Sequence, residues 1–151
     1  ELSDGGMDFA SAIGTGGVPG TKFVWPEDER VRARLREWHG LDPQREALWS
    51  RWFALYNQYR LSEGEYLNLY DIAYDVPEGH VIRKGDRLYY AFYTPKTDDH
   101  FQGAIQLREL EERTYRLTDY VNEEGLGTVE GPVARLDVAF EGSLLIMAVP
   151  E

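Results

Sequence analysis

Hydrophobic residues recur with two different periods along this chain, and the period changes near residue 61. Before that point the spacing is three and four, which is the spacing of one face of an α-helix. Val31, Leu35 and Trp38 follow this spacing, and Gly40 is a typical helix stop. We therefore predict a first helix that ends near Gly40, with arginines on its solvent side.

A second helix is predicted to start at Asp42-Pro43, where an N-cap residue precedes a proline at the first helical position. Its apolar stripe is unusually wide. The stripe consists of Leu48, Trp49, Trp52, Phe53, Leu55, Tyr56 and Tyr59. A stripe of this width is typical of a helix that is buried against a large surface.

From residue 61 onward the period falls to two, which predicts β-strands. The expected strands are residues 67–72, 81–83, 88–93, 104–107, 114–120, 134–140 and 144–149. Turn-forming residues separate them at 77–79, 84–86, 97–99, 124–125 and 141–143. Short strands at this spacing, with no helix between them, indicate an antiparallel sandwich or barrel. The fold class is therefore α+β.

The first 26 residues follow neither pattern. Residues 8–13 are compatible with a short helical turn, residues 14–20 form a glycine-rich loop, and residues 20–25 are typical of a β-strand. A strand followed by helices is the arrangement found where a larger α/β architecture closes. By itself this segment is half of such a motif.

Composition narrows the function classes. The chain has 151 residues, 42% of them hydrophobic and 13% aromatic, so it can form a folded core. The formal net charge of -11 argues against a nucleic-acid partner, because phosphate binding needs a basic face. The absence of Cys excludes disulfides and thiolate metal sites.

No apolar run has the length of a membrane span, so we expect a soluble protein with no membrane partner. The compartment stays open, with the cytoplasm slightly favoured.

The acidity is concentrated at one end. Residues 1–26 carry a net charge of -2, residues 27–60 carry +1, and residues 61–151 carry -10. The first residue is Glu1 and no signal-peptide pattern follows it, so we expect the chain to be a fragment or a processed product.

The sequence contains no complete motif for a dinucleotide site and no zinc-ligand spacing. The glycine-rich loop has Pro19 where a dinucleotide fingerprint needs Gly, and it precedes a predicted strand instead of following one. We interpret it as a tight loop where backbone passes close to backbone. The three histidines, at 39, 80 and 100, share no zinc-ligand spacing, and Asp98-Asp99-His100 is more typical of a solvated turn. We predict neither a metal site nor a cofactor.

Glycoside hydrolysis needs two carboxylates that flank one sugar bond. Asp4 and Asp8, with Gly5 and Gly6 between them, are the acidic positions beside the glycine-rich loop. A turn at Asp4 and an N-cap at Asp8 are the favoured alternatives. Five aromatic residues could stack on sugar rings, although strand alternation places about half of them in the core. They are Tyr89, Tyr90, Phe92, Tyr93 and Phe101.

Residues 1–26, ELSDGGMDFASAIGTGGVPGTKFVWP, resemble the end of the catalytic barrel in bacterial α-galactosidase-like enzymes of glycoside hydrolase family 36 and its clan. Tyr-Arg-Leu at 59–61 resembles the exit from the last barrel helix. Residues 88–93, 105–110, 114–119 and 144–149 resemble, more weakly, strands of the C-terminal β-domain. The resemblance implies that residues 1–60 are the terminal part of a catalytic (β/α)8 barrel. It also implies that residues 61–151 are a C-terminal antiparallel β-sandwich domain.

The resemblance further implies a retaining α-galactosidase-like hydrolase that uses two aspartates and no metal or cofactor. Neither catalytic motif is present here, so both aspartates are expected upstream of Glu1 and the isolated chain is expected to be inactive. Asp4, Gly5, Gly6 and Asp8 are then the candidates nearest the substrate. The expected partners are the remainder of the barrel and a carbohydrate. The alternative is a non-catalytic carbohydrate-binding or structural β-sandwich module. Substrate linkage and oligomeric state stay open.

Overall fold

A computed structural model describes residues 9–19, 29–31, 33–34, 43–67, 77–96 and 98–151. The strand expected at residues 20–25 lies outside these residues. Of the first expected helix, residues 29–31, 33 and 34 are described, and they are helical. The second helix is confirmed as α3 (Pro43–Tyr59). The short helical turn expected at residues 8–13 is found as α1 (Phe9–Gly14).

A single 3₁₀ turn, η1 (Leu61–Glu63), connects α3 to the strands. The strands are β1 (Glu65–Leu67), β2 (Glu78–Lys84), β3 (Arg87–Tyr93), β4 (His100–Leu107), β5 (Thr114–Asp119), β6 (Glu124–Glu130), β7 (Ala134–Glu141) and β8 (Ser143–Pro150). The described part of the chain contains no helix long and apolar enough to cross a membrane.

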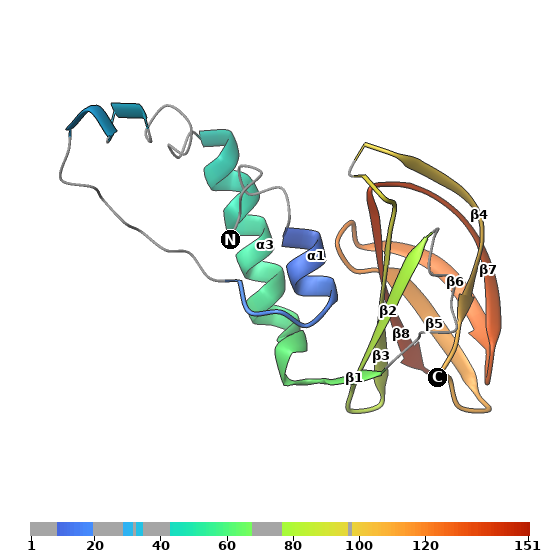
Figure 1. Cartoon of the computed structure of the whole chain (residues 1–151). Helices are drawn as coiled ribbons and strands as arrows, with labels where there is room; N and C mark the ends of the chain where they lie inside the picture. The colour runs from blue at the N-terminus through green and yellow to red at the C-terminus, as the bar shows by residue number, and fades with distance from the viewer. Residues whose placement is uncertain (1–8, 20–28, 32, 35–42, 68–76, 97) are drawn as a thin grey trace.

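The strands form two antiparallel sheets (Figure 1). The larger sheet has six strands in the order β1-β2-β3-β8-β5-β6, and the smaller one pairs β4 with β7. The predicted antiparallel arrangement of the strands is therefore confirmed. One strand was missed: the turn expected at residues 124–125 is wrong, because Glu124 and Gly125 begin β6 and pair with β5. Likewise the turn expected at residues 77–79 overlaps the start of β2 at Glu78.

The central strand β3 is buried on both of its faces. Leu88, Tyr90 and Phe92 belong to the core between the two sheets, whereas Tyr89 and Ala91 belong to a second core on the opposite face. Successive side chains of a strand point to opposite faces, so two cores need apolar residues at both parities. The continuous apolar run of β3 follows from this double burial.

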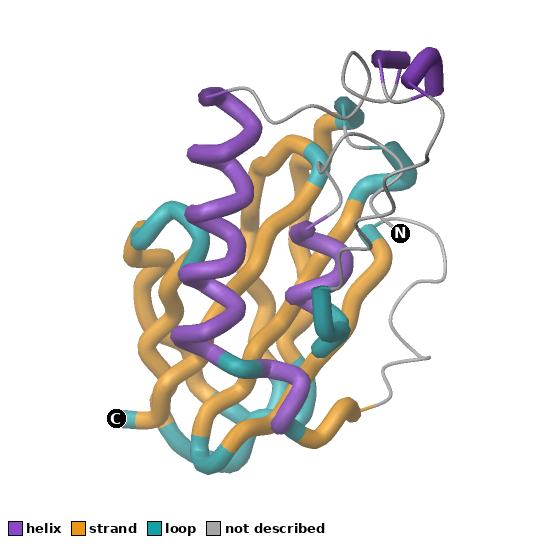
Figure 2. Tube along the Cα trace, turned by 90° about the vertical axis from the view of Figure 1, so that its left-hand side faces the viewer, coloured by secondary structure: helices purple, strands orange, loops and turns teal. Residues whose placement is uncertain are grey.

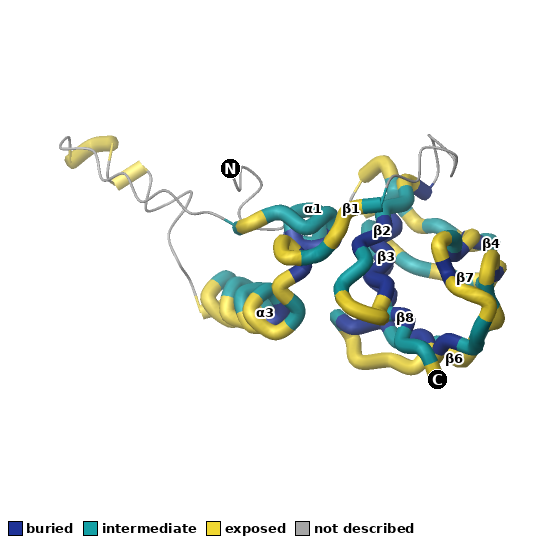
Figure 3. The backbone as a smooth tube through the Cα atoms, turned by 90° about the horizontal axis from the view of Figure 1, so that it is seen from below, coloured by how far each residue is buried: buried dark blue, intermediate teal, exposed yellow. Residues whose placement is uncertain are grey.

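The first core fills the space between the two sheets. Tyr115 and Leu117 of β5, Ile105 and Leu107 of β4, and Ile146 of β8 are at most 3% exposed in it. Figure 3 shows that buried residues gather on β2, β3 and β8, and that β4 and β7 lie on one side of these strands. This is the packing of a β-sandwich, in which inward residues of two sheets make one layer.

The second core lies between the six-stranded sheet and the helices. Ile13 of α1, Leu61 of η1 and Leu145 of β8 are three of its buried members, and they come from distant parts of the chain. Phe9 is fully buried, with its ring 6.0 Å from that of Trp49 and 5.5 Å from that of Phe53. Both helices therefore lie across one face of the sheet, as Figure 2 shows. The wide aromatic stripe of α3 packs on this side of the sheet. Leu55 is buried there, and the other residues of the stripe are half-buried.

Hydrogen bonds join α3 to the β-strands and their turns near its middle and at its C-terminal end. Lys84 at the end of β2 donates to the Tyr59 carbonyl at the helix C-terminus over 2.7 Å and to the Arg60 carbonyl over 3.0 Å. Arg51 donates to the Val121 carbonyl in the turn after β5. The side chain of Asp119 holds that turn by accepting from the Val121 amide over 2.9 Å.

Two buried tyrosines differ in a way that tests the packing. Tyr90 donates its hydroxyl hydrogen to the Arg108 carbonyl, whereas the Tyr120 hydroxyl is buried without a partner among the described residues. We expect Tyr90→Phe to lower the free energy of unfolding by about 1 kcal/mol. Tyr120→Phe should leave it unchanged or raise it by up to about 1 kcal/mol, because the variant removes an unpaired polar group. Urea denaturation at pH 8 measures both; equal losses would contradict the assignment.

The buried Tyr120 also makes the free energy of unfolding depend on pH in the alkaline range. Burial raises the pKa of Tyr120 well above its ordinary value, with Tyr93, Tyr59, Tyr89 and Asp119 adding to the effect. Above about pH 10 the unfolded chain releases this proton while the folded chain keeps it, so the free energy of unfolding falls as the pH rises. We expect this fall to be shallower in Tyr120→Phe than in the parent chain. Urea denaturation between pH 9 and 11 measures the two slopes, and identical slopes would contradict the prediction.

Candidate functional site

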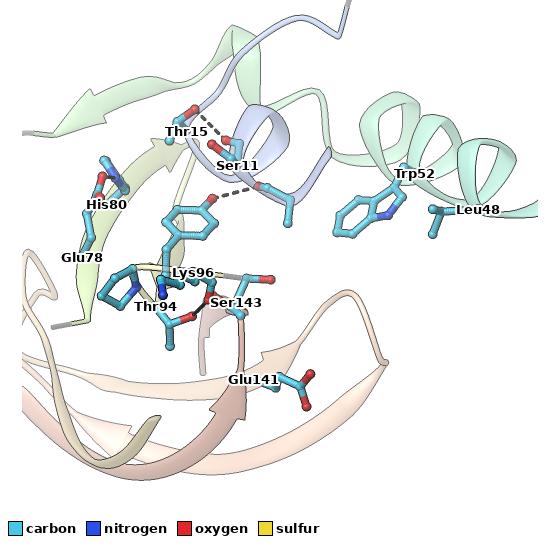
Figure 4. A pocket seen from close by; sticks show the side chains of 14 residues that line it. Ser11, Thr15, Leu48, Trp52, Glu78, His80, Thr94, Lys96, Glu141 and Ser143 are labelled. Carbon is cyan, nitrogen blue, oxygen red and sulfur yellow. Dashed lines mark hydrogen bonds and ion pairs between the residues drawn. The ribbon is translucent and has the colours of Figure 1, made fainter. Parts of the chain in front are cut away.

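A cavity of about 430 Å³ lies where the helices meet the rim of the six-stranded sheet (Figure 4). Five segments of the chain build its walls: α1, α3, β2, the end of β3 with the following turn, and the turn between β7 and β8. Its lining mixes ring faces with polar side chains, and its volume is within the range of small-molecule sites. It is the candidate functional site in the described part of the chain.

A hydrogen-bonded chain of side chains occupies the β2 wall. Nε2 of His80 lies 2.6 Å from Oε1 of Glu78, and Nδ1 lies 2.7 Å from the Tyr66 hydroxyl. A carboxylate only accepts, so Nε2 donates to Glu78, while Nδ1 is paired with the Tyr66 hydroxyl. Both nitrogens of His80 are thereby occupied, and the imidazole is fixed at the cavity wall.

Tyr93 stands in the middle of the site. Its hydroxyl donates to the Ala10 carbonyl of α1 over 2.8 Å, and its ring lies 5.8 Å from that of His80. The helix α1 can approach this closely because Gly14 has no side chain: a Cβ there would lie 2.1 Å from the Tyr93 hydroxyl and 2.7 Å from the Ala91 Cβ. The predicted close approach of backbone to backbone in the glycine-rich loop is found at Gly17, where an added Cβ would lie 2.8 Å from the Ala12 carbonyl oxygen.

The two turns at the floor of the cavity are bonded to each other. The Thr94 hydroxyl donates to the Lys96 carbonyl over 2.6 Å and to the Gly142 carbonyl over 3.0 Å. The amide of Thr94 also donates to the Gly142 carbonyl over 2.9 Å. Gly142 has a φ of 67°, a conformation that suits glycine, and this tight turn was predicted at 141–143. These bonds fix the positions of Lys96 and Ser143.

The formal charge of the lining is negative. Glu78 and Glu141 contribute two carboxylates and Lys96 one ammonium, which gives -1 with His80 neutral. Oε2 of Glu141 lies 3.7 Å from Nε2 of His100, in an exposed pair that contributes little stability. An anionic ligand is therefore disfavoured here relative to a neutral or cationic one.

The sequence-predicted substrate candidates Asp4, Gly5, Gly6 and Asp8 lie outside the described residues. They immediately precede α1, whose residues Ala10 and Ser11 line the cavity. In the described part of the chain, no group of three His, Asp or Glu side chains converges in a metal-ligand arrangement.

More of the proposed sugar-stacking aromatics are buried than strand alternation predicted, because both faces of β3 are covered. Tyr89, Tyr90 and Phe92 are at most 4% exposed and serve the two cores. Phe101 packs on Phe140 across the small sheet, with ring centroids 5.3 Å apart. Of the five, Tyr93 lines the cavity.

Several lining residues were missed by sequence reasoning. The period of two places Glu78 and His80 on one face of β2, so their pairing could have been read from the sequence. Trp52 was assigned to a buried stripe, and nothing in the sequence joins it to Ser143 or Lys96. That convergence depends on how α3 crosses the sheet.

No protein-family model matches the chain. The chain is 28% identical over 146 residues, 93% of its length, to an A type blood alpha-D-galactosamine galactosaminidase of Flavonifractor plautii. The match spans 12% of that protein, so the chain corresponds to a small part of this relative. The resemblance to α-galactosidase-like glycoside hydrolases that was expected from the sequence is confirmed by this similarity.

The fold of the chain was also compared with solved structures. An α-amylase from Anoxybacillus, described as a new glycosyl hydrolase subclass, matches 73% of this chain and 23% of its own with a TM-score of 0.53 at 11% identity. That likeness shows a shared fold alone. A GH27 β-L-arabinopyranosidase from Geobacillus stearothermophilus covers 51% of this chain and 18% of its own at 12% identity, with a TM-score of 0.36, too low to carry an argument.

The contact between α1 and β3 can be tested with a pair of glycine variants. We expect Gly14→Ala to lower the free energy of unfolding by about 1–3 kcal/mol, because the new methyl group forces α1 away from Ala91 and Tyr93. Gly125→Ala is the matched control, since no atom lies within 4 Å of the added Cβ, and its effect should stay within about 0.5 kcal/mol. Thermal and urea denaturation measure both variants. Equal stability of Gly14→Ala and the parent chain would contradict the packing.

Proposed function

We propose that the chain is the C-terminal part of a retaining α-galactosidase-like glycoside hydrolase, acting on α-linked galactose or galactosamine units. The observation that carries this proposal is the similarity to the galactosaminidase over 93% of the chain. The similarity extends over both the helical segment and the strands, which a chance match to one motif would not do.

In this proposal, residues 1–60 are the last part of the catalytic barrel and residues 61–151 are the β-domain that packs against it. The packing of α1 and α3 on the six-stranded sheet supports this arrangement. The buried residues Ile13 and Ile82 come from the two sides of the proposed boundary and share one core. The Arg51 guanidinium, which donates to the Val121 carbonyl, adds a polar tie across the same boundary. A rigid attachment of this kind would let the β-domain brace the barrel end.

Catalysis would come from a pair of aspartates upstream of Glu1. A retaining glycosidase needs two carboxyl groups about 5–5.5 Å apart, one as nucleophile and one as acid and base. The chemistry requires no metal and no cofactor. Asp4, Gly5, Gly6 and Asp8 would contribute to the substrate end of the barrel, because they are the acidic and glycine positions beside the glycine-rich loop.

A second candidate is a non-catalytic carbohydrate-binding module. The cavity favours it, because Trp52 and Tyr93 present rings beside hydroxyl and carboxylate groups in one pocket. A purely structural β-sandwich would need no such pocket.

Activity assays distinguish the proposals. The purified 151-residue chain should release no nitrophenol from nitrophenyl α-galactoside or α-galactosaminide above the uncatalysed rate. The protein encoded by the reading frame extended upstream through a full barrel should hydrolyse at least one of them. NMR of its first product should show the α-anomer, which is the signature of retention. Turnover by the 151-residue chain, or inversion by the extended protein, would contradict the proposal.

A further inference from the structure

The cavity between the helices and the sheet rim presents two kinds of surface. Trp52 and Tyr93 offer aromatic rings. Ser11, Ser143 and Glu141, which Figure 4 labels, offer two hydroxyls and a carboxylate. A ligand that matches this lining has apolar C–H faces and a rim of hydrogen-bonding groups. A pyranose ring has this character.

The walls are held in place before any ligand arrives. Phe9 stacks on Trp52 with centroids 6.3 Å apart and an angle of 10° between the rings. Tyr93 is bonded to Ala10, and the Thr94 hydroxyl joins the two floor turns. A site whose side chains are already ordered loses less conformational entropy on binding, which favours recognition of a small ligand.

Other ligand classes fit the lining less well. The lining charge of -1 disfavours phosphates, nucleotides and uronic acids. A metal ion has no cluster of three ligands in the described part of the chain. At about 430 Å³ the cavity has room for one sugar unit with its first waters.

We propose that this cavity binds a single hexose or hexosamine unit, with a preference for the ammonium-bearing or neutral sugar over the anionic one. Trp52 and Tyr93 contact the ring faces, Ser143 bonds a hydroxyl, and Glu141 attracts the ammonium group. The choice of sugars as the ligand class rests on the proposed function; the place and the charge preference rest on the cavity itself.

The experiment titrates the 151-residue chain with galactosamine, galactose and galacturonate, followed by two-dimensional NMR of ¹⁵N-labelled protein. A ligand with roughly a dozen non-hydrogen atoms gives an expected dissociation constant in the low millimolar range, that is about 1–10 mM. Shifts should be saturable, should map to Ser11, Trp52, Thr94 and Ser143, and should be strongest for galactosamine. Galacturonate should bind at least about fivefold more weakly.

Two pairs of variants locate the site. Ser143→Phe, which places a ring in the cavity, should abolish binding, whereas Ser143→Ala should weaken it by about two- to fivefold through the loss of one hydrogen bond. Glu141→Gln should weaken galactosamine by about two- to fivefold and leave galactose unchanged. Glu112→Gln removes the same charge at an exposed position outside the lining and should have no effect. Denaturation curves verify that each variant is folded.

Three results would overturn the inference: no saturable shift with any sugar at about 50 mM, well above the expected dissociation constant; binding that survives Ser143→Phe in a folded variant; or tighter binding of galacturonate than of galactosamine. None of these touches the proposed function, which is decided by hydrolysis in the extended protein. Conversely, the extended protein could be inactive while the 151-residue chain still binds sugar. That result would support the sugar site and contradict the proposed hydrolase function.

Discussion

Burial of the six-stranded sheet on both faces is the constraint on which the rest of this structure depends. β3 and β8 lie at its centre, and they supply Tyr90 and Ile146 to one core and Tyr89 and Leu145 to the other. A sheet with apolar residues at both parities needs a cover on each side. The pair β4–β7 covers one side and the helices cover the other. Loss of the helices would expose the second core to water, so α1 and α3 stabilise the β-domain directly.

The cavity is a consequence of how that helical cover is attached. α1 contacts β3 through Gly14 and the Tyr93–Ala10 hydrogen bond, while α3 crosses the sheet farther along and is fixed by Lys84 and Arg51. Near the Tyr93 end of β3 the helices do not fill the space above the turns that follow β3 and β7. Rings from the core edge and polar groups from the turns therefore meet there, which is the composition expected of a small-molecule site.

Function and fold rest on different observations in this protein. The likeness to the α-amylase concerns the arrangement of strands and is shared at 11% identity, so it carries no chemistry. The proposed glycosidase function rests on the residues themselves, through their similarity to the galactosaminidase. The net charge of -10 on residues 61–151 is a property of composition and by itself identifies no catalytic carboxylate.

The sequence by itself determined the element types, because hydrophobic period reports directly which faces are buried. The helix at Pro43–Tyr59 and the strands β3, β5, β7 and β8 were readable in this way. β6 was not, since Leu126 and Val129, which both pack against the first core, are three residues apart and break the period of two. The register of β6 on β5 shifts between Leu117 and Thr118. Only the tertiary structure decided that Trp52, His80, Lys96 and Ser143 share one cavity. Their convergence depends on strand order and on the crossing of α3 over the sheet, which are set by long-range packing and leave no local pattern in the chain.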